Sequence, residues 1–473
     1  MRRGAEPQNS ALGDLDAPGL EQLLLDPSAF GRVLLGYDLW GAQVEILRAL
    51  AKCPRVAVKA CHASGKTTTA AIAVLWWISR FRDAIAVTTA PTWTQVERLL
   101  WGEIHRAVRR SVVPFPIPNQ TELRLGPGNY AIGLSTNEGV RFQGFHGRVL
   151  IVLDEAPGVK PEIWEAIEGI RAGGDVRVLA LGNPVVASGP FYDAFTTNRE
   201  GWSTFTISAF NSPNLSGVTM DDLDQMQPEE LDVAERPYLV SRRWVQEKWR
   251  EWGPANPLWQ ARVLGEFPIQ AEDALVPLAW LEAARSRHLE PDAEAQWCAG
   301  VDVAGPGEDE TVLVVRHGPQ IVETRAWPQQ DPRGEVVAAL KTYADRDLRV
   351  YVDAVGIGYY LARHLEDAGF SVRDVNVGKA AKDPEKYANR KAELYWGLRQ
   401  RIQDGDLTDL TDERTIAQLA AIRYHHNARG QIVIESKEEL RKRGVKSPDR
   451  AEAVMLAFIT KRPFRLEDHI IFI

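Results

Sequence analysis

Residues 56–68 read VAVKACHASGKTT. An alternating apolar run gives way to small residues and then to Gly-Lys-Thr, and an alanine-rich segment follows. This is the strand–loop–helix order in which a P-loop holds the phosphates of a nucleotide. Backbone N–H groups at the start of the helix face the phosphates, a lysine reaches the outer oxygens, and a hydroxyl suits Mg²⁺. The stretch therefore predicts a nucleotide-binding α/β domain.

The candidate nucleotide-binding residues lie around the Gly-Lys-Thr triplet. We expect Lys66 to reach the β and γ oxygens and Thr67 to be an Mg²⁺ ligand. Ala60 stands where the motif has its first glycine, and a chance Gly-Lys-Thr at a helix start is the alternative interpretation. The full set is Ala60, Ser64, Gly65, Lys66, Thr67 and Thr68.

A helix entry at 37–47 precedes the P-loop strand and carries Trp40 and Gln43. A glutamine amide can pair with both N6 and N7 of adenine, so Gln43 is a candidate adenine contact. A solvated glutamine on a helix is the alternative.

A second motif lies about ninety residues beyond the P-loop, where residues 148–156 read RVLIVLDEA. An apolar strand that ends in Asp-Glu is the pattern of a Walker B element. Asp154 would hold Mg²⁺ through water, and Glu155 would deprotonate the attacking water. A buried strand followed by an acidic helix cap is the alternative, but the P-loop upstream favours an NTPase.

Further strands are expected at 84–92 and 176–181, and a helix at 94–101 with Thr94 as its N-cap. The strand at 176–181 runs into Gly-Asn-Pro, where Asn183 would sense the γ-phosphate or simply form a turn. P-loop and Walker B motifs on separate buried strands predict a doubly wound parallel sheet.

The composition is ordinary for a globular protein, with 473 residues, 45% apolar residues and a net charge of −8. Its three cysteines imply neither a disulfide framework nor a zinc site. No apolar run approaches the ~20 residues that span a bilayer, so we expect an intracellular protein without a membrane partner.

The second half of the chain changes character. Short strands are expected at 298–304, 311–315 and 320–324, then a helix at 334–344, a strand at 349–356 and a helix at 358–368. This β-β-β-α-β-α order is that of the RNase H-like nucleases.

Carboxylates interrupt apolar runs in this half, where an unpaired buried carboxylate is costly. Asp302 lies in the middle of the first expected strand and Asp353 at the end of the fourth. Asp449 and Glu452 share the face of a late helix. Together they are candidate ligands for two Mg²⁺ or Mn²⁺ ions that would cleave a phosphodiester. Turn and cap roles are the alternative.

Basic residues cluster near these acids and would neutralise phosphates or form solvated helix faces. They are Lys379, Lys382, Lys386, Arg390, Lys391, Arg441, Lys442, Arg443 and Lys446. The apolar tail 470–473 would be a last strand or a docking peptide. We predict an arm at 1–35, a P-loop ATPase domain at 36–268 with a lid or linker part at 211–268, a linker at 269–295 and an RNase H-like nuclease domain at 296–473.

The paired motifs resemble the large terminase subunit of tailed bacteriophages over roughly residues 39–461. Further stretches match that family: TAPT at 89–92 with Gln95, RFQGFH at 141–146, LGEFP at 264–268, VDVA at 301–304 with Asp309, and VDAVGIG at 352–358. Two departures are Cys61-His62, where many relatives have Arg or Gln, and Glu452-Ala453 in place of Asp-Ala. The third metal ligand is therefore open between Asp449 and Glu452.

The resemblance implies an ATP-driven motor that moves double-stranded DNA into a procapsid and an endonuclease that cuts concatemeric DNA. It implies a ring of about five copies at the portal protein, a monomer in solution as the other state, and a small terminase subunit as partner. It also implies an arginine finger, with Arg141 the first candidate and Arg148 the second. The expected location is the cytoplasm of the infected host, at the portal during packaging, and not the mature virion.

Two alternatives have different chemistry. One is a helicase-like DNA-dependent ATPase whose C-terminal domain is not catalytic. The other is a recombinase-type metal nuclease with a degenerate ATP site.

Overall fold

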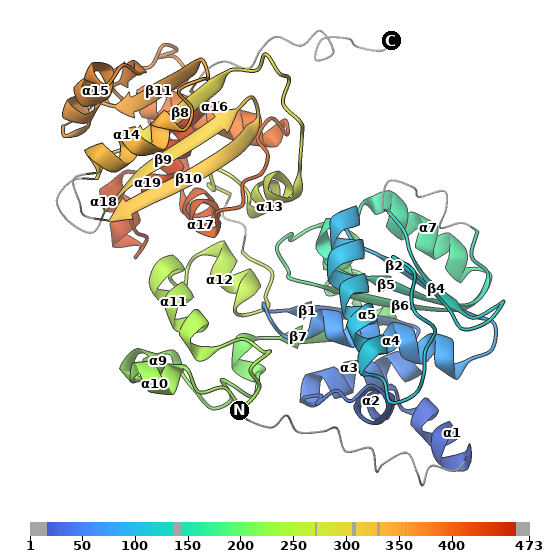
Figure 1. The fold of residues 1–473 in the computed structure, drawn as a ribbon. Coiled ribbons are helices and arrows are strands. Elements are labelled where there is room, and N and C mark those ends of the chain that lie inside the picture. The colour runs from blue at the N-terminus through green and yellow to red at the C-terminus, as the bar shows by residue number, and fades with distance from the viewer. Residues whose placement is uncertain are drawn as a thin grey trace, which may run out of the picture. The chain divides into compact units, whose positions relative to one another are not determined.

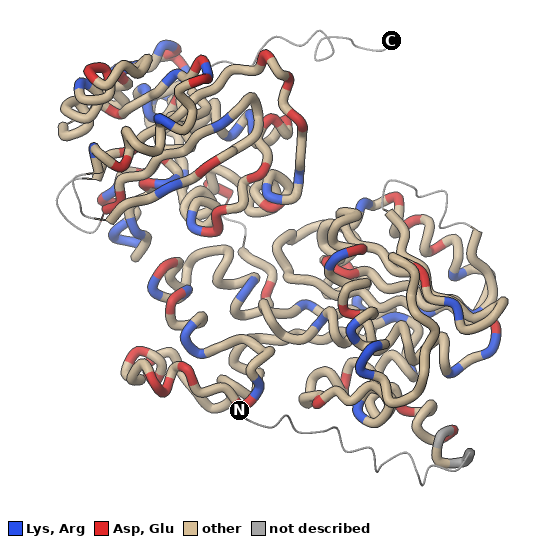
Figure 2. The backbone as a smooth tube through the Cα atoms, viewed as in Figure 1, with Lys and Arg blue, Asp and Glu red and all other residues tan. Residues whose placement is uncertain are grey.

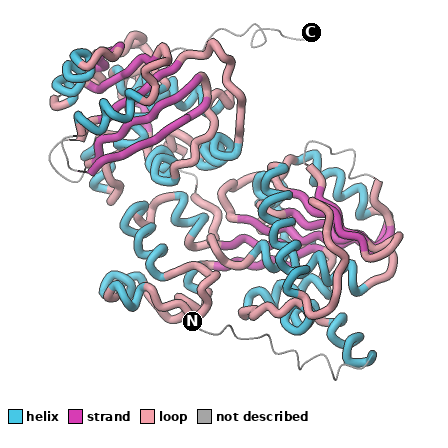
Figure 3. The backbone as a smooth tube through the Cα atoms, viewed as in Figure 1, coloured by secondary structure: helices cyan, strands magenta, loops and turns pink. Residues whose placement is uncertain are grey.

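The computed structural model describes residues 17–135, 144–269, 272–304, 309–328, 332–354 and 356–459 (Figure 1). The described residues form two compact units: the first runs to Glu247 and includes Gln260–Pro268, and the second holds Lys248–Trp259 and the residues from Ile269 onward. Strands lie at the centre of each unit with helices around them (Figure 3). Among the described residues, no helix combines the length and the apolar character needed to cross a membrane.

The first unit is built on a seven-stranded sheet in the order β3-β4-β2-β5-β6-β1-β7. All neighbouring strands are parallel except β3 and β4. The strand β6 separates the P-loop strand β1 from the strand β5 that ends in Asp-Glu, so the predicted doubly wound parallel sheet is confirmed. The strands are β1 (Arg55–Ala60), β2 (Ala84–Thr89), β3 (Glu122–Arg124), β4 (Tyr130–Gly133), β5 (Gly147–Leu153), β6 (Gly174–Gly182) and β7 (Ser203–Ile207).

Helices cover both faces of this sheet, which explains why its strands are nearly continuous apolar runs. In β5 the side chains of Val149, Ile151 and Leu153 join the cluster beneath α7, while Leu150 and Val152 are equally buried on the other face. The helices of the first unit are α1 (Ala17–Leu25), α2 (Pro27–Ala29), α3 (Gly41–Lys52), α4 (Lys66–Arg80), α5 (Trp101–Arg110), α7 (Pro161–Arg171), α8 (Gly189–Asp193), α9 (Met220–Gln225) and α10 (Pro228–Leu231). Two further helices, α11 (Arg242–Trp252) and α12 (Pro257–Arg262), are divided between the units, and residues 248–259 belong to the second.

Two segments differ from the predicted boundaries. In the predicted arm, Phe30, Leu34 and Leu35 are at most 2% exposed, because this stretch packs its apolar residues on the unit. The predicted linker contains α13 (Leu278–Ser286), which buries Leu278 and Leu281. Burial of apolar side chains thus extends the two units into stretches that the sequence pattern left outside them.

The helix after β2 shows that the predicted N-cap, Thr94, is wrong. Thr94 has helical dihedral angles and makes no side-chain cap bond. Thr92 and Gln95 form the reciprocal cap instead: the Thr92 N–H donates to Gln95 Oε1 (3.0 Å) and the Gln95 N–H donates to Thr92 Oγ1 (3.3 Å). A threonine followed three residues later by glutamine is a capping-box pattern that the sequence already carried.

The second unit has a five-stranded sheet in the order β10-β9-β8-β11-β12. The first three strands are antiparallel, and β8, β11 and β12 are parallel. The predicted β-β-β-α-β-α order of RNase H-like nucleases is therefore confirmed. Its elements are β8 (Trp297–Asp302), β9 (Glu310–His317), β10 (Gln320–Pro328), α14 (Arg333–Lys341), β11 (Leu348–Asp353), α15 (Gly358–Asp367), β12 (Ser371–Val375), α16 (Arg390–Gln403), α17 (Glu413–Ala421), β13 (Tyr424–His426), β14 (Ile432–Ile434), α18 (Lys437–Lys442) and α19 (Asp449–Ala457).

Candidate active sites

The loop between β1 and α4 is held by its own backbone. The Cys61 N–H donates to Ile207 O and the His62 N–H donates to Arg262 O, both at 2.8 Å. Because these two amides already donate to protein carbonyls, the groups left to contact a phosphate lie in the second half of the loop, from Ala63 to Thr67. The Asn183 side chain, which follows β6, donates to Ala60 O at 2.6 Å and fixes the end of β1.

Two side chains of the α3 region hold the second half of the loop. The Trp40 indole N–H donates to Ser64 O (3.2 Å), and Gln43 Nε2 donates to Gly65 O (3.1 Å) and to Thr69 Oγ1 (3.3 Å). Gln43 is 2% exposed, so its amide supports the loop in this state, and its contact with adenine stays a prediction. Gly65 has a φ of +83°, and a Cβ there would lie 2.6 Å from the Gln43 amide nitrogen.

The acid pair lies beside the lysine of the loop. Lys66 Nζ is 4.0 Å from Glu155 Oε1 and 3.5 Å from Cys61 O. Burial, followed by the neighbouring Glu155 carboxylate, raises the pKa of Asp154 to about 7, while Lys66 and a hydrogen bond with the Thr67 hydroxyl oppose the rise. Glu155 has a φ of +48°, which is uncommon outside glycine and typical of strained functional positions.

These side chains fit a magnesium nucleotide. The Ser64 hydroxyl is buried and makes no hydrogen bond to any described residue, so it is a polar atom that a phosphate oxygen could satisfy. Thr67 and Asp154 together offer hydroxyl and carboxylate oxygens, which are the ligands Mg²⁺ prefers. The Thr68 hydroxyl, by contrast, donates to Glu103 Oε1 of α5 at 3.0 Å. This bond gives Thr68 a structural role, in which it holds α4 against α5.

The two arginine-finger candidates have different outcomes. Arg141 lies outside the described residues. Arg148 lies near the start of β5, whereas Asp154 follows its end, so about 20 Å of strand separates them. Its Nε is 3.3 Å from Asp175 Oδ2, and its guanidinium lies over the Phe81 ring. Arg148 therefore does not reach the nucleotide site of its own chain.

In the second unit, Asp302 and Asp353 end neighbouring parallel strands. Val301 of β8 pairs with Val352 of β11, so the next residue on each strand emerges at the same edge of the sheet. The prediction that Asp302 lies in the middle of its strand is wrong, because β8 ends at that residue. The apolar residues that follow Asp302 in the sequence do not continue the pairing.

The helix α19 brings the other two acids to this edge. It packs against β8 at Gly300, where an added Cβ would lie 2.9 Å from Leu456 C and closer still to Ala453 O and Ala457 N. Only a glycine allows this approach. Asp449 and Glu452, in the first turn of α19, are 4% and 7% exposed.

Lysines lie beside two of these acids, and Lys437 Nζ is 3.4 Å from Asp449 Oδ1. Glu452 is 2.6 Å from Lys391 Nζ and 3.1 Å from Lys437 Nζ. Although burial opposes its ionisation, the Lys391 and Lys437 ammonium groups lower the pKa of Glu452. Burial, followed by the Glu452 carboxylate, raises the pKa of Asp302 well above its usual range. The pKa values of Asp302 and Glu452 are thus shifted in opposite directions.

Asp449 is positioned by protein donors on both oxygens. The Ser447 hydroxyl donates to Oδ1, and the Glu310 N–H donates to Oδ2 at 3.0 Å. The Gln418 side chain caps α19, because its Oε1 accepts from the Arg450 N–H (2.8 Å) and the Ala451 N–H (3.1 Å).

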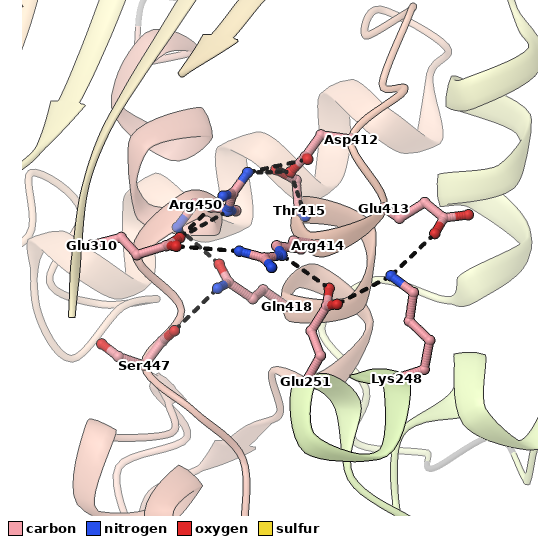
Figure 4. Close-up of polar contacts among 10 residues, drawn as sticks. All are labelled: Lys248, Glu251, Glu310, Asp412, Glu413, Arg414, Thr415, Gln418, Ser447 and Arg450. Carbon is pink, nitrogen blue, oxygen red and sulfur yellow. Dashed lines mark hydrogen bonds and ion pairs between the residues drawn. The ribbon is translucent and has the colours of Figure 1, made fainter. Parts of the chain in front are cut away.

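Charged residues continue this network away from the site (Figure 4). Arg450 pairs with Glu310 and with Asp412, both at 3.1 Å. Arg414 contacts Glu310 at 3.2 Å and Glu251 of α11 at 3.4 Å. The strand residue beside Asp449 is therefore tied to α17 and to the last turn of α11.

The donor set fits Mg²⁺ or Mn²⁺, because all of its members are carboxylates. Among the described residues, however, no three acids, histidines or cysteines are arranged to hold an ion as they stand. Lys437 Nζ contacts both Asp449 (3.4 Å) and Glu452 (3.1 Å), and the pairing of Val301 with Val352 brings Asp302 and Asp353 to the same sheet edge.

Several predicted phosphate-binding cations are paired inside the unit. Besides Lys391, Arg390 contacts Glu393 (2.5 Å) and Arg443 contacts Glu435 (2.6 Å). Figure 2 shows Lys and Arg interspersed with Asp and Glu over both units. These three cations are therefore paired with acids of their own unit.

Sequence reasoning did not single out Lys437, Gln418, Gly300 or Tyr395 as parts of the site. Tyr395 is fully buried, its hydroxyl has no hydrogen-bond partner among the described residues, and burial followed by Glu452 raises its pKa well above its usual range. The Ser436–Glu439 capping box marks the start of α18, and with it Lys437, from sequence. The others depend on packing between distant segments.

Comparison with known proteins gives one sequence relative and several structures. No protein-family model matches the chain. A probable terminase, large subunit, of Enterobacteria phage P7 is 26% identical over 330 residues, which cover 66% of this chain and 63% of that protein. The matched region thus spans less than two thirds of the relative's length.

Solved structures similar to the chain include one whole large terminase and two nuclease domains. The HK97 bacteriophage large terminase has a TM-score of 0.37 at 14% identity, covering 89% of this chain and 95% of that one. The large terminase nuclease domain of bacterial virus Sf6 has a TM-score of 0.35 at 21% identity (39% and 98% covered). The nuclease of thermophilic phage G20c with bound magnesium has a TM-score of 0.31 at 18% identity (40% and 98% covered). The chain is thus similar in sequence to a large terminase subunit, which confirms the resemblance that its motifs predict.

Proposed function

We propose that this chain is a viral DNA-packaging motor and nuclease. ATP hydrolysis in the first unit drives double-stranded DNA into a procapsid, and the second unit cuts concatemeric DNA at the start and end of packaging. The observation that carries the proposal is the presence in one chain of a P-loop site with an acid pair and of an RNase H-like sheet edge with four acids.

In the first unit, Lys66 and the Ser64 hydroxyl would bind phosphate oxygens, and Thr67 with Asp154 would hold Mg²⁺. The bound ion supplies charge neutralisation on the phosphates. Glu155 lies close enough to Lys66 to be freed from it by an incoming phosphate, and would then orient and deprotonate water. Asn183, bonded to the end of β1, would transmit changes at the phosphates to β6.

In the second unit, Asp302, Asp353, Asp449 and Glu452 would hold two Mg²⁺ or Mn²⁺ ions. The bound ions supply Lewis-acid activation at the scissile phosphate. Lys391 and Lys437, which contact Glu452, would lie beside the substrate phosphate and neutralise its charge.

We infer the partners by analogy with large terminase subunits alone. They are the portal protein of the procapsid, a small terminase subunit, and further copies of this chain in a ring of about five. Arg141 remains the candidate for a finger that acts on a neighbouring copy. The expected location is the host cytoplasm.

Packaging into purified procapsids tests this function directly. We expect ATP consumption and nuclease-protected DNA with the wild-type chain, and loss of both with Lys66→Ala. Lys52→Ala, an exposed lysine of α3, is the matched control. ATP-independent protection, or no ATP use with DNA and portal present, would refute the motor; the helicase-like alternative further predicts that no cleavage accompanies hydrolysis.

A further inference from the structure

An exposed apolar patch lies at the start of α15. Ile357, Tyr359 and Tyr360 are 47%, 47% and 69% exposed. Large apolar side chains that are exposed singly are ordinary, but three within four residues point to a binding surface. The later exposed positions of the same helix are Arg363, His364, Glu366 and Asp367, as expected for a solvated face.

The patch lies directly beside the candidate nuclease site. Gly358 packs so closely on the Asp353 carbonyl that an added Cβ would overlap it, and that Cβ would be 3.7 Å from Val303 Cγ2. Val303 follows Asp302. The first turn of α15 is therefore packed on the sheet edge where β8 and β11 end, and Figure 1 shows α15 beside β11.

The fold keeps the two tyrosines outward. The buried face of α15, formed by Leu361, Ala362 and Leu365, joins the core of the unit. Arg363 lies over the Tyr359 ring at 5.1 Å and is itself held by Asp374 at 2.8 Å. Tyr359 thus has a braced ring.

Tyr360 is the outermost member. Its ring meets Tyr359 edge-on, with centroids 5.8 Å apart and planes at 81°. Tyr359 is held by Arg363, and Tyr360 presents the larger exposed surface to a ligand.

We propose that Ile357, Tyr359 and Tyr360 form a platform on which a nucleobase next to the scissile bond stacks, with Tyr360 as the stacking residue. The inference rests on the proposed nuclease function. Every base has an apolar π-face, so such a platform binds without sequence preference. Lysines beside the acids would bind the phosphates, whereas this exposed aromatic surface would contact the bases.

The test uses the full-length chain with Asp302→Asn and no divalent ion, so that binding is measured without cleavage. The probe is a duplex oligonucleotide with a short unpaired stretch that carries 2-aminopurine, whose fluorescence falls on stacking. We expect quenching with Tyr360 and with Tyr360→Phe. With Tyr360→Leu we expect loss of quenching and a Kd raised about 5- to 150-fold, the range of one base–aromatic stack.

Ile117→Ala removes an apolar side chain that is 94% exposed in the other unit and is the control for general surface effects. If Tyr360→Leu quenches and binds like Tyr360→Phe, the platform is refuted while the nuclease stands. An altered oligomeric state with unchanged DNA binding would assign the patch to protein contact and also overturn it. If the chain with Asp302 intact neither binds nor cuts DNA, the proposed function itself falls.

Discussion

Replacing Gly300 by alanine tests the packing that assembles the nuclease acids. The new Cβ would lie 2.9 Å from Leu456 C and nearer to two backbone atoms of α19, against about 3.5–4.0 Å for a relaxed carbon contact. Since all three contacted atoms belong to the backbone, α19 has to move by more than about half an ångström. Over-packing of this kind costs about 1–3 kcal/mol. Because the first turn of α19 carries Asp449 and Glu452, a shift of about 1 Å there is expected to reduce cleavage on the order of a hundredfold.

Cleavage of plasmid DNA with Mn²⁺, ATP hydrolysis, and urea unfolding are measured on the same preparations. Gly397→Ala is the matched control, because Gly397 is exposed on α16 with no atom within 4 Å of the added Cβ. That variant should gain about 0.5–1 kcal/mol and cleave normally. Wild-type cleavage and stability in Gly300→Ala would refute the close approach of α19 to β8; loss of ATP hydrolysis alone would refute its assignment to the nuclease.

Three other groups of side chains give measurable predictions. Burial raises the pKa of Cys61 to about 12, so about one Cys61 thiol in ten thousand is ionised at pH 8. After treatment of the native chain with iodoacetamide, mass spectrometry should find the label on the partly exposed Cys53 and not on Cys61. Equal labelling of the two cysteines would contradict the burial of Cys61. Glu452→Gln should weaken Mn²⁺ binding in titration calorimetry more than Asp449→Asn, because a backbone N–H and a neighbouring hydroxyl hold the oxygens of Asp449, whereas long lysine side chains hold those of Glu452; the reverse order would identify Asp449 as the third ligand. Gln418→Ala should lower stability to urea by about 1 kcal/mol while Gln418→Glu, which keeps the accepting oxygen, largely retains it; equal effects would refute the cap.

The sequence was sufficient for the elements whose chemistry is local. The P-loop strand, the acid-ended strand β5 and the order of strands and helices in the second unit are periodic patterns with short-range punctuation. Because the carboxyl ends of neighbouring parallel strands meet at one edge of a sheet, the strand pattern alone is enough to bring Asp302 and Asp353 together.

The remaining features depend on contacts that no local pattern contains. In the sequence Gly300 is an ordinary strand glycine, and only its contact with the α19 backbone in the fold shows why a glycine is required. The basic cluster predicts phosphate contact for Lys391 but gives no sign of its acidic partner, Glu452, which is sixty-one residues away in the sequence. Gln43 carries the pattern of a nucleotide contact, yet its amide holds the loop from a buried position. Charge and burial at such positions are set by tertiary packing, which single-sequence reasoning does not reach.

The most direct test of the central claim is a crosswise measurement on three preparations of the full chain. Wild type, Lys66→Ala and Asp302→Asn are each assayed for DNA-stimulated ATP hydrolysis and for Mn²⁺-dependent cleavage of the same DNA, with exposed Asp345→Asn as the control for charge removal. Two separate active sites predict that Lys66→Ala loses hydrolysis and retains cleavage, and that Asp302→Asn does the reverse. Unchanged cleavage in Asp302→Asn, or unchanged hydrolysis in Lys66→Ala, would contradict it.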